Sequence, residues 1–308
     1  MDSSVKAIVV MAAIFVISQL GAIFMVSSIL GTEQQAFENP NDPMIPIYYF
    51  VAMVAFTFAI LYIIKKKRDQ VVKQVFLGAM AFTIFYVILV IMVKFDAGIL
   101  SLVVSLGLTA FLTYYLIKKP EWYVIDITGV LVAIGVIGIL GISLQILPVL
   151  ILLIILAVYD AVSVYGTKHM VALADGVTKL RLPVLLVIPK KRGYSYLDQK
   201  PLKQQIADGD EREAMFMGLG DVIIPGVLIS SAFYFLGEDA VAGIPGNLVV
   251  ALGTLIGALI GFSILMRYVL KGNPQAGLPL LNGGAIAGYI IAYLVAFGDL
   301  SLGITLPW

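Results

Sequence analysis

The stretch GLGDVII (residues 218–224) begins a run of apolar residues that continues to about Leu236, with Asp221 near its start. A second carboxylate, Asp160, stands in the apolar stretch AVYDAVSVYG (157–166). Acidic side chains inside a membrane-spanning segment are costly and usually serve a function. The fold and the function therefore depend on whether these runs span a membrane and whether the two carboxylates meet.

The composition is that of an integral membrane protein. Of the 308 residues, 61% are hydrophobic and 13% are charged, about half the charge of an ordinary soluble domain. A formal net charge of +1 gives no indication of a nucleic-acid partner. The chain has no cysteine, which excludes disulfides, thiolate metal sites and cysteine nucleophiles. We therefore expect an all-α membrane protein.

Nine apolar windows are each long enough to cross a bilayer, which takes about 20 residues. They cover residues 5–30, 46–64, 71–93, 98–117, 124–143, 147–171, 214–236, 243–270 and 278–306. The first window is too long for a signal-peptide core, so we predict a retained span. The chain is then one polytopic domain over 1–308, with helices 1–6 at about 1–171, a loop at 172–213 and helices 7–9 at about 214–308.

Charge alternates between successive connections. Lys and Arg gather in residues 65–73, 118–122, 172–213 and 267–275, whereas residues 32–42 and 237–243 are acidic. The positive-inside rule then places the N-terminus in the cytoplasm and the C-terminus outside. Within the long cytoplasmic loop, residues 182–189 have the composition of a short β-segment bounded by prolines.

Asp160 and Asp221 are predicted to lie at a similar depth on antiparallel helices. At 1.5 Å per residue, Asp160 would lie about 12–14 residues into the sixth helix and Asp221 about seven residues into the seventh. Both would then be about 10 Å from the cytoplasmic face. Ser163 and Thr167 continue the face of Asp160 toward the cytoplasm. Asp126, near the cytoplasmic end of the fifth helix, is expected to contact the interface or a loop.

Two close carboxylates that share a proton can act as base and acid in the hydrolysis of a peptide bond. This chemistry needs no metal or cofactor, and we expect neither. The one histidine, His169, is expected at a helix end beside Lys168, and a zinc site of the HExxH kind needs two histidines. The alternative is a proton- or cation-coupled transporter or channel. The lack of an internal repeat and the long loop favour the protease.

The motifs then resemble those of the presenilin and signal peptide peptidase family of intramembrane aspartyl proteases. YD at Tyr159–Asp160 matches the family's sixth-helix motif, and GLGD at Gly218–Asp221 matches its seventh-helix motif. The resemblance extends over the whole chain. It implies that Asp160 and Asp221 are catalytic and that Tyr159, Gly218, Leu219 and Gly220 lie beside the substrate.

A third family motif, Pro-Ala-Leu, aligns here with Ala276, Gly277 and Leu278, which are followed by Pro279. Gly277 and Pro279 favour an unwound, closely approached backbone beside the aspartates. Pro279 also suits the first turn of a helix. We expect Gly277, Leu278 and Pro279 to bind substrate. The charge pattern matches the presenilin orientation, which indicates a presenilin-like prokaryotic homologue.

A transmembrane substrate hides its backbone in its own helix and must be unwound before cleavage. We predict that Leu185 and Val187 offer an edge strand to the unwound chain; an amphipathic interfacial segment is the alternative. The expected partners are transmembrane-helix substrates and the lipid bilayer, and no nucleic acid. A homo-oligomer is compatible with the sequence. The expected location is the plasma membrane, with the active site opening toward the cytoplasm.

Overall fold

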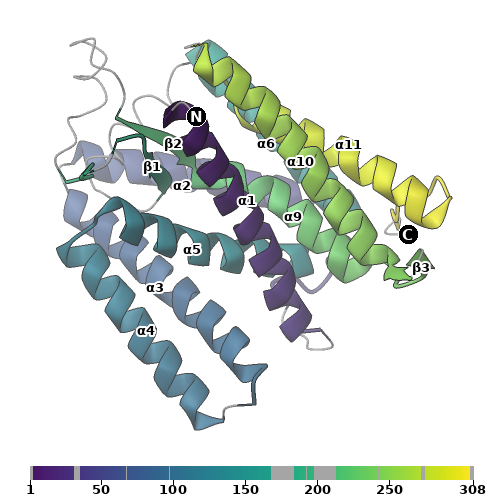
Figure 1. Cartoon of the computed structure of the whole chain (residues 1–308), viewed down its shortest axis with the longest axis horizontal. Helices are drawn as coiled ribbons and strands as arrows, with labels where there is room; N and C mark the ends of the chain where they lie inside the picture. Colours follow the sequence, from purple (N-terminus) through teal and green to yellow (C-terminus); the bar gives the residue numbers. More distant parts are fainter. Residues whose placement is uncertain are drawn as a thin grey trace. The chain divides into compact units, whose positions relative to one another are not determined.

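The computed structural model describes residues 3–30, 35–66, 68–96, 98–167, 184–191, 193–197, 213–241, 243–271 and 275–305. Most of these residues are helical (Figure 1). The helices are α1 (Ser3–Ser28), α2 (Ile45–Lys65), α3 (Asp69–Val93), α4 (Ile99–Lys118), α5 (Trp122–Ser143), α6 (Ile146–Val162), a π-helical turn (Ser163–Thr167), α9 (Leu219–Phe235), α10 (Gly246–Leu270) and α11 (Leu278–Phe297). The strands are β1 (Leu185–Pro189), β2 (Ala214–Gly218), β3 (Ala240–Val241) and β4 (Ile244–Pro245).

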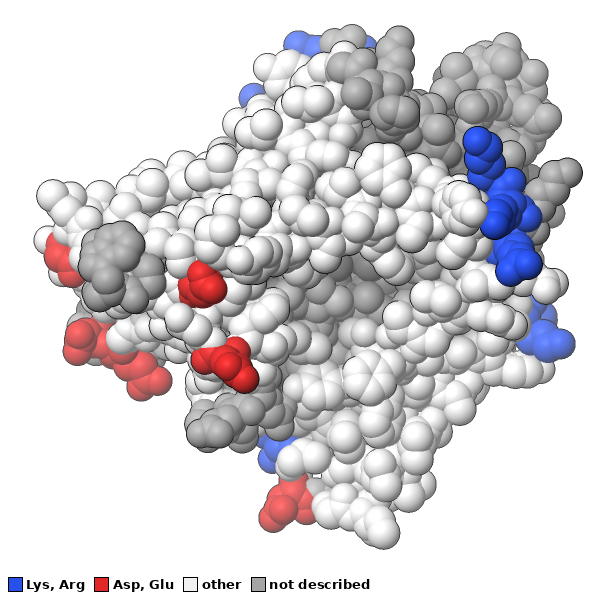
Figure 2. All heavy atoms as spheres, turned by 180° about the vertical axis from the view of Figure 1, so that it is seen from behind, with Lys and Arg blue, Asp and Glu red and all other residues white. Residues whose placement is uncertain are grey.

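The described helices suit a bilayer. Eight of them are long and apolar enough to cross a membrane, and α9 is a shorter apolar helix of 17 residues. Large apolar side chains such as Phe58, Phe82 and Ile99 are exposed, and most of the face drawn in Figure 2 carries no charged side chain. The predicted all-α membrane fold with about nine spans and a short β-segment is therefore confirmed. Its orientation stays a prediction.

The main difference from the sequence prediction lies just before Asp221. A helix was expected from Ala214, but Ala214–Gly218 form the extended strand β2, and α9 begins only at Leu219. Glycines at 218 and 220 weaken the helix there, and pairing with β1 supplies the hydrogen bonds that the helix would have made. Asp221 consequently stands in the first turn of α9, and the depth counted along a helix from Ala214 does not apply.

The chain divides into two compact units, which we describe separately. One comprises Met1–Ser18, Phe56–Gly135 and His169–Gly220, and the other comprises Gln19–Ala55, Val136–Lys168 and Asp221–Trp308. The first unit holds the β1–β2 pair, and the second holds both Asp160 and Asp221. The single polytopic domain expected from the sequence stays a prediction.

In the second unit, α10 and α11 pack with their backbones in close contact (Figure 1). A Cβ added at Gly257 would collide with the carbonyl oxygen of Gly284, and one added at Gly284 would collide with that of Gly257. Gly261 lies one turn further along and faces the Leu280 carbonyl. Small residues at a spacing of four allow this approach between membrane helices.

Helix α11 is also tied to α6. The side-chain amide of Asn282 donates a hydrogen bond of 2.9 Å to the carbonyl oxygen of Leu153, and both groups are buried. In an apolar interior such a bond is costly to lose, because the freed carbonyl or amide has no water to bond. The start of α11 is therefore held against α6 near the level of Asp160.

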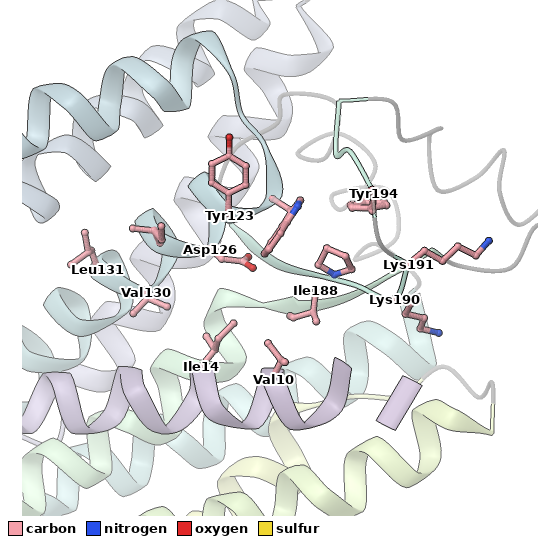
Figure 3. A pocket seen from close by; sticks show the side chains of 14 residues that line it. Val10, Ile14, Tyr123, Asp126, Val130, Leu131, Ile188, Lys190, Lys191 and Tyr194 are labelled. Atoms are coloured by element: carbon pink, nitrogen blue, oxygen red, sulfur yellow. The ribbon is translucent and has the colours of Figure 1, made fainter. Parts of the chain in front are cut away.

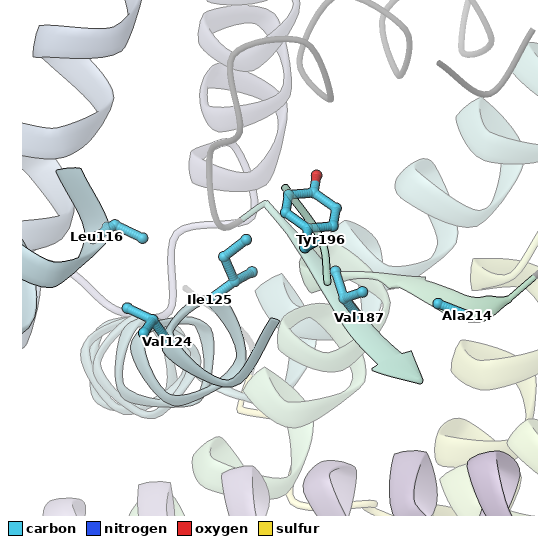
Figure 4. Close-up of a cluster of buried hydrophobic side chains, with 6 residues drawn as sticks. All are labelled: Leu116, Val124, Ile125, Val187, Tyr196 and Ala214. Carbon is cyan, nitrogen blue, oxygen red and sulfur yellow. The ribbon is translucent and has the colours of Figure 1, made fainter. Parts of the chain in front are cut away.

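In the first unit, the β1–β2 pair packs on α5 through buried side chains (Figure 4). The cluster contains Leu116 of α4, Val124 and Ile125 of α5, Val187 of β1, Ala214 of β2 and Tyr196 of the following loop. Val187 and Ile125 are almost fully buried. Burial of a Val or Ile side chain contributes about 1.5–3 kcal/mol, so these contacts hold the small sheet to the helices.

The glycine contact between α10 and α11 predicts opposite outcomes for two neighbouring substitutions. Gly284→Ala should destabilise the protein by about 1–3 kcal/mol, because the new methyl group overpacks a backbone contact. Gly283→Ala should leave stability nearly unchanged, because a Cβ there meets nothing within 4 Å. Thermal unfolding in detergent measures both. Equal melting temperatures for the two variants would contradict the packing described.

Candidate functional site

Asp160 is placed by the last turn of α6. Its side chain is only 5% exposed, and α6 ends two residues later, at Val162. A π-helical turn over Ser163–Thr167 follows. Such turns are rare and occur mostly at functional sites. The turn breaks the 3.6-residue spacing on which the expected polar face through Thr167 was based, although Ser163 is buried as that face required.

Asp221 stands in the first turn of α9, and its residue is half-buried. Pro225, four residues later, has no amide to bond the Asp221 carbonyl, which loosens this turn. The buried side chain of Gln19 donates a hydrogen bond of 2.9 Å to the carbonyl oxygen of Val222. The turn that carries Asp221 is thus held by a side chain from α1 at the point where the α9 backbone is weakest.

Both carboxylates meet the same short piece of backbone at the start of α11. The amide of Leu278 donates a hydrogen bond of 3.0 Å to Oδ2 of Asp160. A Cβ built on Gly277 would lie 3.0 Å from Oδ1 and 3.2 Å from Oδ2 of Asp221. Two consecutive residues therefore contact two aspartates that are 61 positions apart in the sequence.

The segment before α11 is held by its main chain. The amide of Ala276 donates to the hydroxyl of Tyr165 at 3.4 Å, and the amide of Leu281 donates to the carbonyl of Gly277 at 3.1 Å. Gly277 has a right-handed helical conformation, so its lack of a Cβ is needed for the close approach of Asp221 and not for its backbone angles. Pro279 lies in the first turn of α11, as predicted.

This arrangement can perform acid–base chemistry. Two carboxylates beside one backbone segment can share one proton. One can accept a proton from water while the other donates one. Among the residues that the structure describes, no three His, Cys, Asp or Glu side chains come together as metal ligands. The prediction that no metal or cofactor is used stays a prediction.

The other residues expected beside a substrate either flank one of the aspartates in the sequence or lie at the start of α11. Tyr159 packs edge-on against Phe50 of α2, with ring centroids 5.5 Å apart. Leu219 is buried, whereas Gly220 is exposed and a Cβ added there would meet nothing within 4 Å. Gly218 ends β2. Leu278 and Pro279 are half-buried. Their contact with a substrate stays a prediction.

The strand predicted at residues 182–189 is confirmed over Leu185–Pro189 as β1, which pairs antiparallel with β2, while residues 182 and 183 lie outside the described residues. The amide of Leu219 donates to the carbonyl of Val184 at 3.0 Å, and the amide of Lys190 donates to that of Glu213 at 2.8 Å. Because main-chain groups alternate along an antiparallel pair, these bonds show which groups point outward. The outward-facing main-chain groups are those of Leu185, Val187 and Pro189 on β1 and those of Ala214, Phe216 and Gly218 on β2.

The outer edge of β1 is already occupied. The amide of Val187 donates a hydrogen bond of 2.7 Å to Oδ1 of Asp126, a buried residue of α5. Pro189 has no amide to offer. The expectation that Asp126 contacts a loop is thus correct, since its partner belongs to the 6–7 connection. Val187 can pair with another strand through its amide only if Asp126 releases it.

Sequence reasoning missed Gln19 and Asn282, which hold α9 and α11 by hydrogen bonds to buried carbonyls. The available signal was a lone amide side chain inside each apolar run, since a polar group in a membrane span needs a partner. Lys168 and His169, expected at the end of the sixth helix, lie outside the described residues.

Comparison with known proteins indicates the family of the chain. The model of the family described as signal-peptide peptidase, presenilin aspartyl protease matches residues 12–298. A presenilin family intramembrane aspartate protease solved in space group C222 is 32% identical, with a TM-score of 0.68 over 94% of this chain and 99% of that one. One solved in space group P2 is 32% identical, with a TM-score of 0.67 over 93% and 97%. No curated protein matches.

The approach of Asp221 to Gly277 predicts a graded response to side-chain size. Gly277→Val should lower peptide cleavage about 100-fold, because displacing a reacting group by about 1 Å has an effect of that order. Gly277→Ala should cost less than about tenfold, since a single methyl group requires the carboxylate to move only by tenths of an ångström. Cleavage of a single-span substrate in detergent measures both. Equal rates in the Val and Ala variants would show that Asp221 does not need this space.

Proposed function

Because the chain belongs to the signal-peptide peptidase and presenilin family of aspartyl proteases and so cleaves peptide bonds within membranes, we propose that Asp160 and Asp221 are its catalytic pair. The observation that carries this assignment is that Leu278 donates to Asp160 while Gly277, the residue before it, lies beside the carboxylate of Asp221.

In the proposed reaction the pair holds one proton. The ionised aspartate takes a proton from a water molecule, whose oxygen attacks the carbonyl carbon of the scissile peptide, while the protonated aspartate donates to the carbonyl oxygen. The resulting tetrahedral diol then collapses: the C–N bond breaks, and the amine leaves with a proton from the pair. A hydroxyl of the diol returns a proton to the pair as the new carboxyl group forms, so the pair again holds one proton and the cycle closes without a metal or cofactor.

The substrate is a transmembrane segment, and we propose that it binds as an extended strand on the outer edge of β2. Main-chain groups of Phe216 and Gly218 face that edge, whereas the edge of β1 is covered at Val187. Strand addition recognises backbone rather than sequence. Gly218 is also only three residues before Asp221 in the chain, so a substrate strand aligned along β2 leads toward the first turn of α9.

For the surroundings of this strand, we propose that Gly220 leaves room for the substrate backbone and that Tyr159 and Leu219 border it. The open space around Gly220 supports this role. We further propose that Gly277, Leu278 and Pro279 line the opposite side of the scissile bond, since the first two already contact the catalytic carboxylates.

We propose that the active site opens to the cytoplasm of a cell whose plasma membrane holds the protein. The support is the distribution of charge: α2 and α4 both end in lysine, at Lys65 and Lys118, where an inside end is expected. Glu238 and Asp239 follow α9, where an outside end is expected. Protease protection of tags on the two chain ends in right-side-out vesicles measures this orientation.

The catalytic assignment predicts loss of function from two single-atom changes. Asp160→Asn and Asp221→Asn should each reduce cleavage of a single-span substrate by at least about 10⁴-fold, because an amide can neither accept nor donate the proton. The control is Asp96→Asn, an exposed acid in the turn between α3 and α4, which should keep full activity. Cleavage that persists in either site variant would refute the pair, and an ion flux without cleavage would favour transport.

Strand addition predicts that replacing Phe216 with proline lowers cleavage more than replacing it with alanine. Proline removes only an outward amide, which an edge strand tolerates, so β1 and β2 should still pair. Phe216→Pro should therefore lower cleavage at least about tenfold relative to Phe216→Ala, which controls for loss of the ring. Product formation and thermal unfolding are measured for both. Equal cleavage by the two variants would exclude pairing at this edge.

A further inference from the structure

The first unit contains a buried carboxylate outside the proposed catalytic pair. Asp126 lies one turn into α5, is 8% exposed, and accepts a hydrogen bond of 2.7 Å from the Val187 amide across 61 residues of sequence. A carboxylate is costly to bury without a strong partner. Here it bonds the main chain of a strand whose side chain at Val187 also packs against α5.

Glu121, the residue just before α5, accepts hydrogen bonds from the loop that follows β1. Oε1 of Glu121 accepts the hydroxyl of Ser195 at 2.9 Å, and Oε2 accepts the amide of Tyr196 at 3.1 Å. Gly129, about one turn beyond Asp126, lets Leu186 of β1 come close, since a Cβ there would lie 3.1 Å from its side chain. One face of α5 therefore fixes both the strand and the loop that follows it.

The hydrogen bond of Asp126 limits which edge of the sheet can pair with a third strand. It blocks the outward amide of Val187, and Pro189 supplies none, so β1 cannot readily accept a third strand. A substrate strand is left with the outer edge of β2, which is continuous with the GLGD sequence at 218–221. The height at which β1 is fixed on α5 also fixes β2, because the two strands are hydrogen-bonded in one register.

We infer that Asp126 is a positioning residue of the protease: its carboxylate holds β1 on α5, closes the β1 edge and thereby sets which substrate bond is presented for cleavage. This role rests on the proposed strand addition at β2. It requires a hydrogen-bond acceptor of the right length at position 126, and it does not require a proton to be exchanged.

Space beside Asp126 makes the inference testable by substitution. Figure 3 shows the residue reaching from α5 into a cavity of about 770 Å³, with Val10 and Ile14 of α1 across from it and Ile188 of β1 beside it. A longer side chain can therefore be accommodated. Asp126→Glu keeps a carboxylate but lengthens it by one methylene group, Asp126→Asn keeps an acceptor of the same length, and Asp126→Leu removes the acceptor.

The experiment is mass spectrometry of the products from one single-span substrate, with kcat and KM, for these three variants. Asp126→Asn should keep at least half of the rate and the parent cleavage position. Asp126→Leu should lower kcat/KM at least tenfold and spread cleavage over neighbouring bonds, and Asp126→Glu should displace the main cleavage position. Should the Leu variant fail to fold, the Asn and Glu variants still decide the outcome.

Two results would overturn the inference. Loss of all activity in Asp126→Asn would mean that the carboxylate does more than accept a hydrogen bond. An unchanged cleavage position in Asp126→Glu would mean that the contact does not position the substrate, and an unchanged position in a folded Asp126→Leu would mean the same. Asp160→Asn and Asp221→Asn, assayed alongside, separate these results from failure of the catalytic pair: activity in either of those variants refutes the pair whatever Asp126 does.

Discussion

The hydrogen bond from the Leu278 amide to Asp160 is the interaction on which the site depends. It joins the end of α6 to the start of α11, and the neighbouring Gly277 brings Asp221 to the same backbone. Such a bond is strong because its acceptor can carry charge. The glycine contact of α10 with α11 and the Asn282 bond to α6 keep that backbone in place. Helix packing away from the aspartates therefore helps to fix the positions of both carboxylates.

Much of this could be predicted from the sequence. Apolar windows gave most of the helices to within a few residues, because a bilayer imposes a length on each span. The last helix was predicted to reach residue 306, but α11 ends at Phe297. The YD and GLGD motifs indicated Asp160 and Asp221 as site residues, because acidic residues inside membrane spans usually have a function. The chain before α9 was predicted wrongly: Ala214–Gly218 are apolar enough for a span, and only their hydrogen-bonded partner, distant in sequence, makes them a strand.

The part of the site that could not be predicted consists of contacts between side chains and main chain. Nothing near Asp126 in the sequence indicates that its partner is the amide of Val187, and nothing near Gln19 indicates the carbonyl of Val222. These bonds join segments that are far apart in the chain, and a main-chain partner leaves no trace in residue identity. The polarity of such residues was visible, but the groups that satisfy them were not.

The start of α11 also bears on how sequences of this kind diverge. Its contacts with the aspartates are made by an amide at Leu278 and by the small size of Gly277, and neither depends on a particular tripeptide. Ala-Gly-Leu can thus stand where the related motif reads Pro-Ala-Leu. At these two positions the contacts require a small residue and then any residue other than proline, which has no amide to donate.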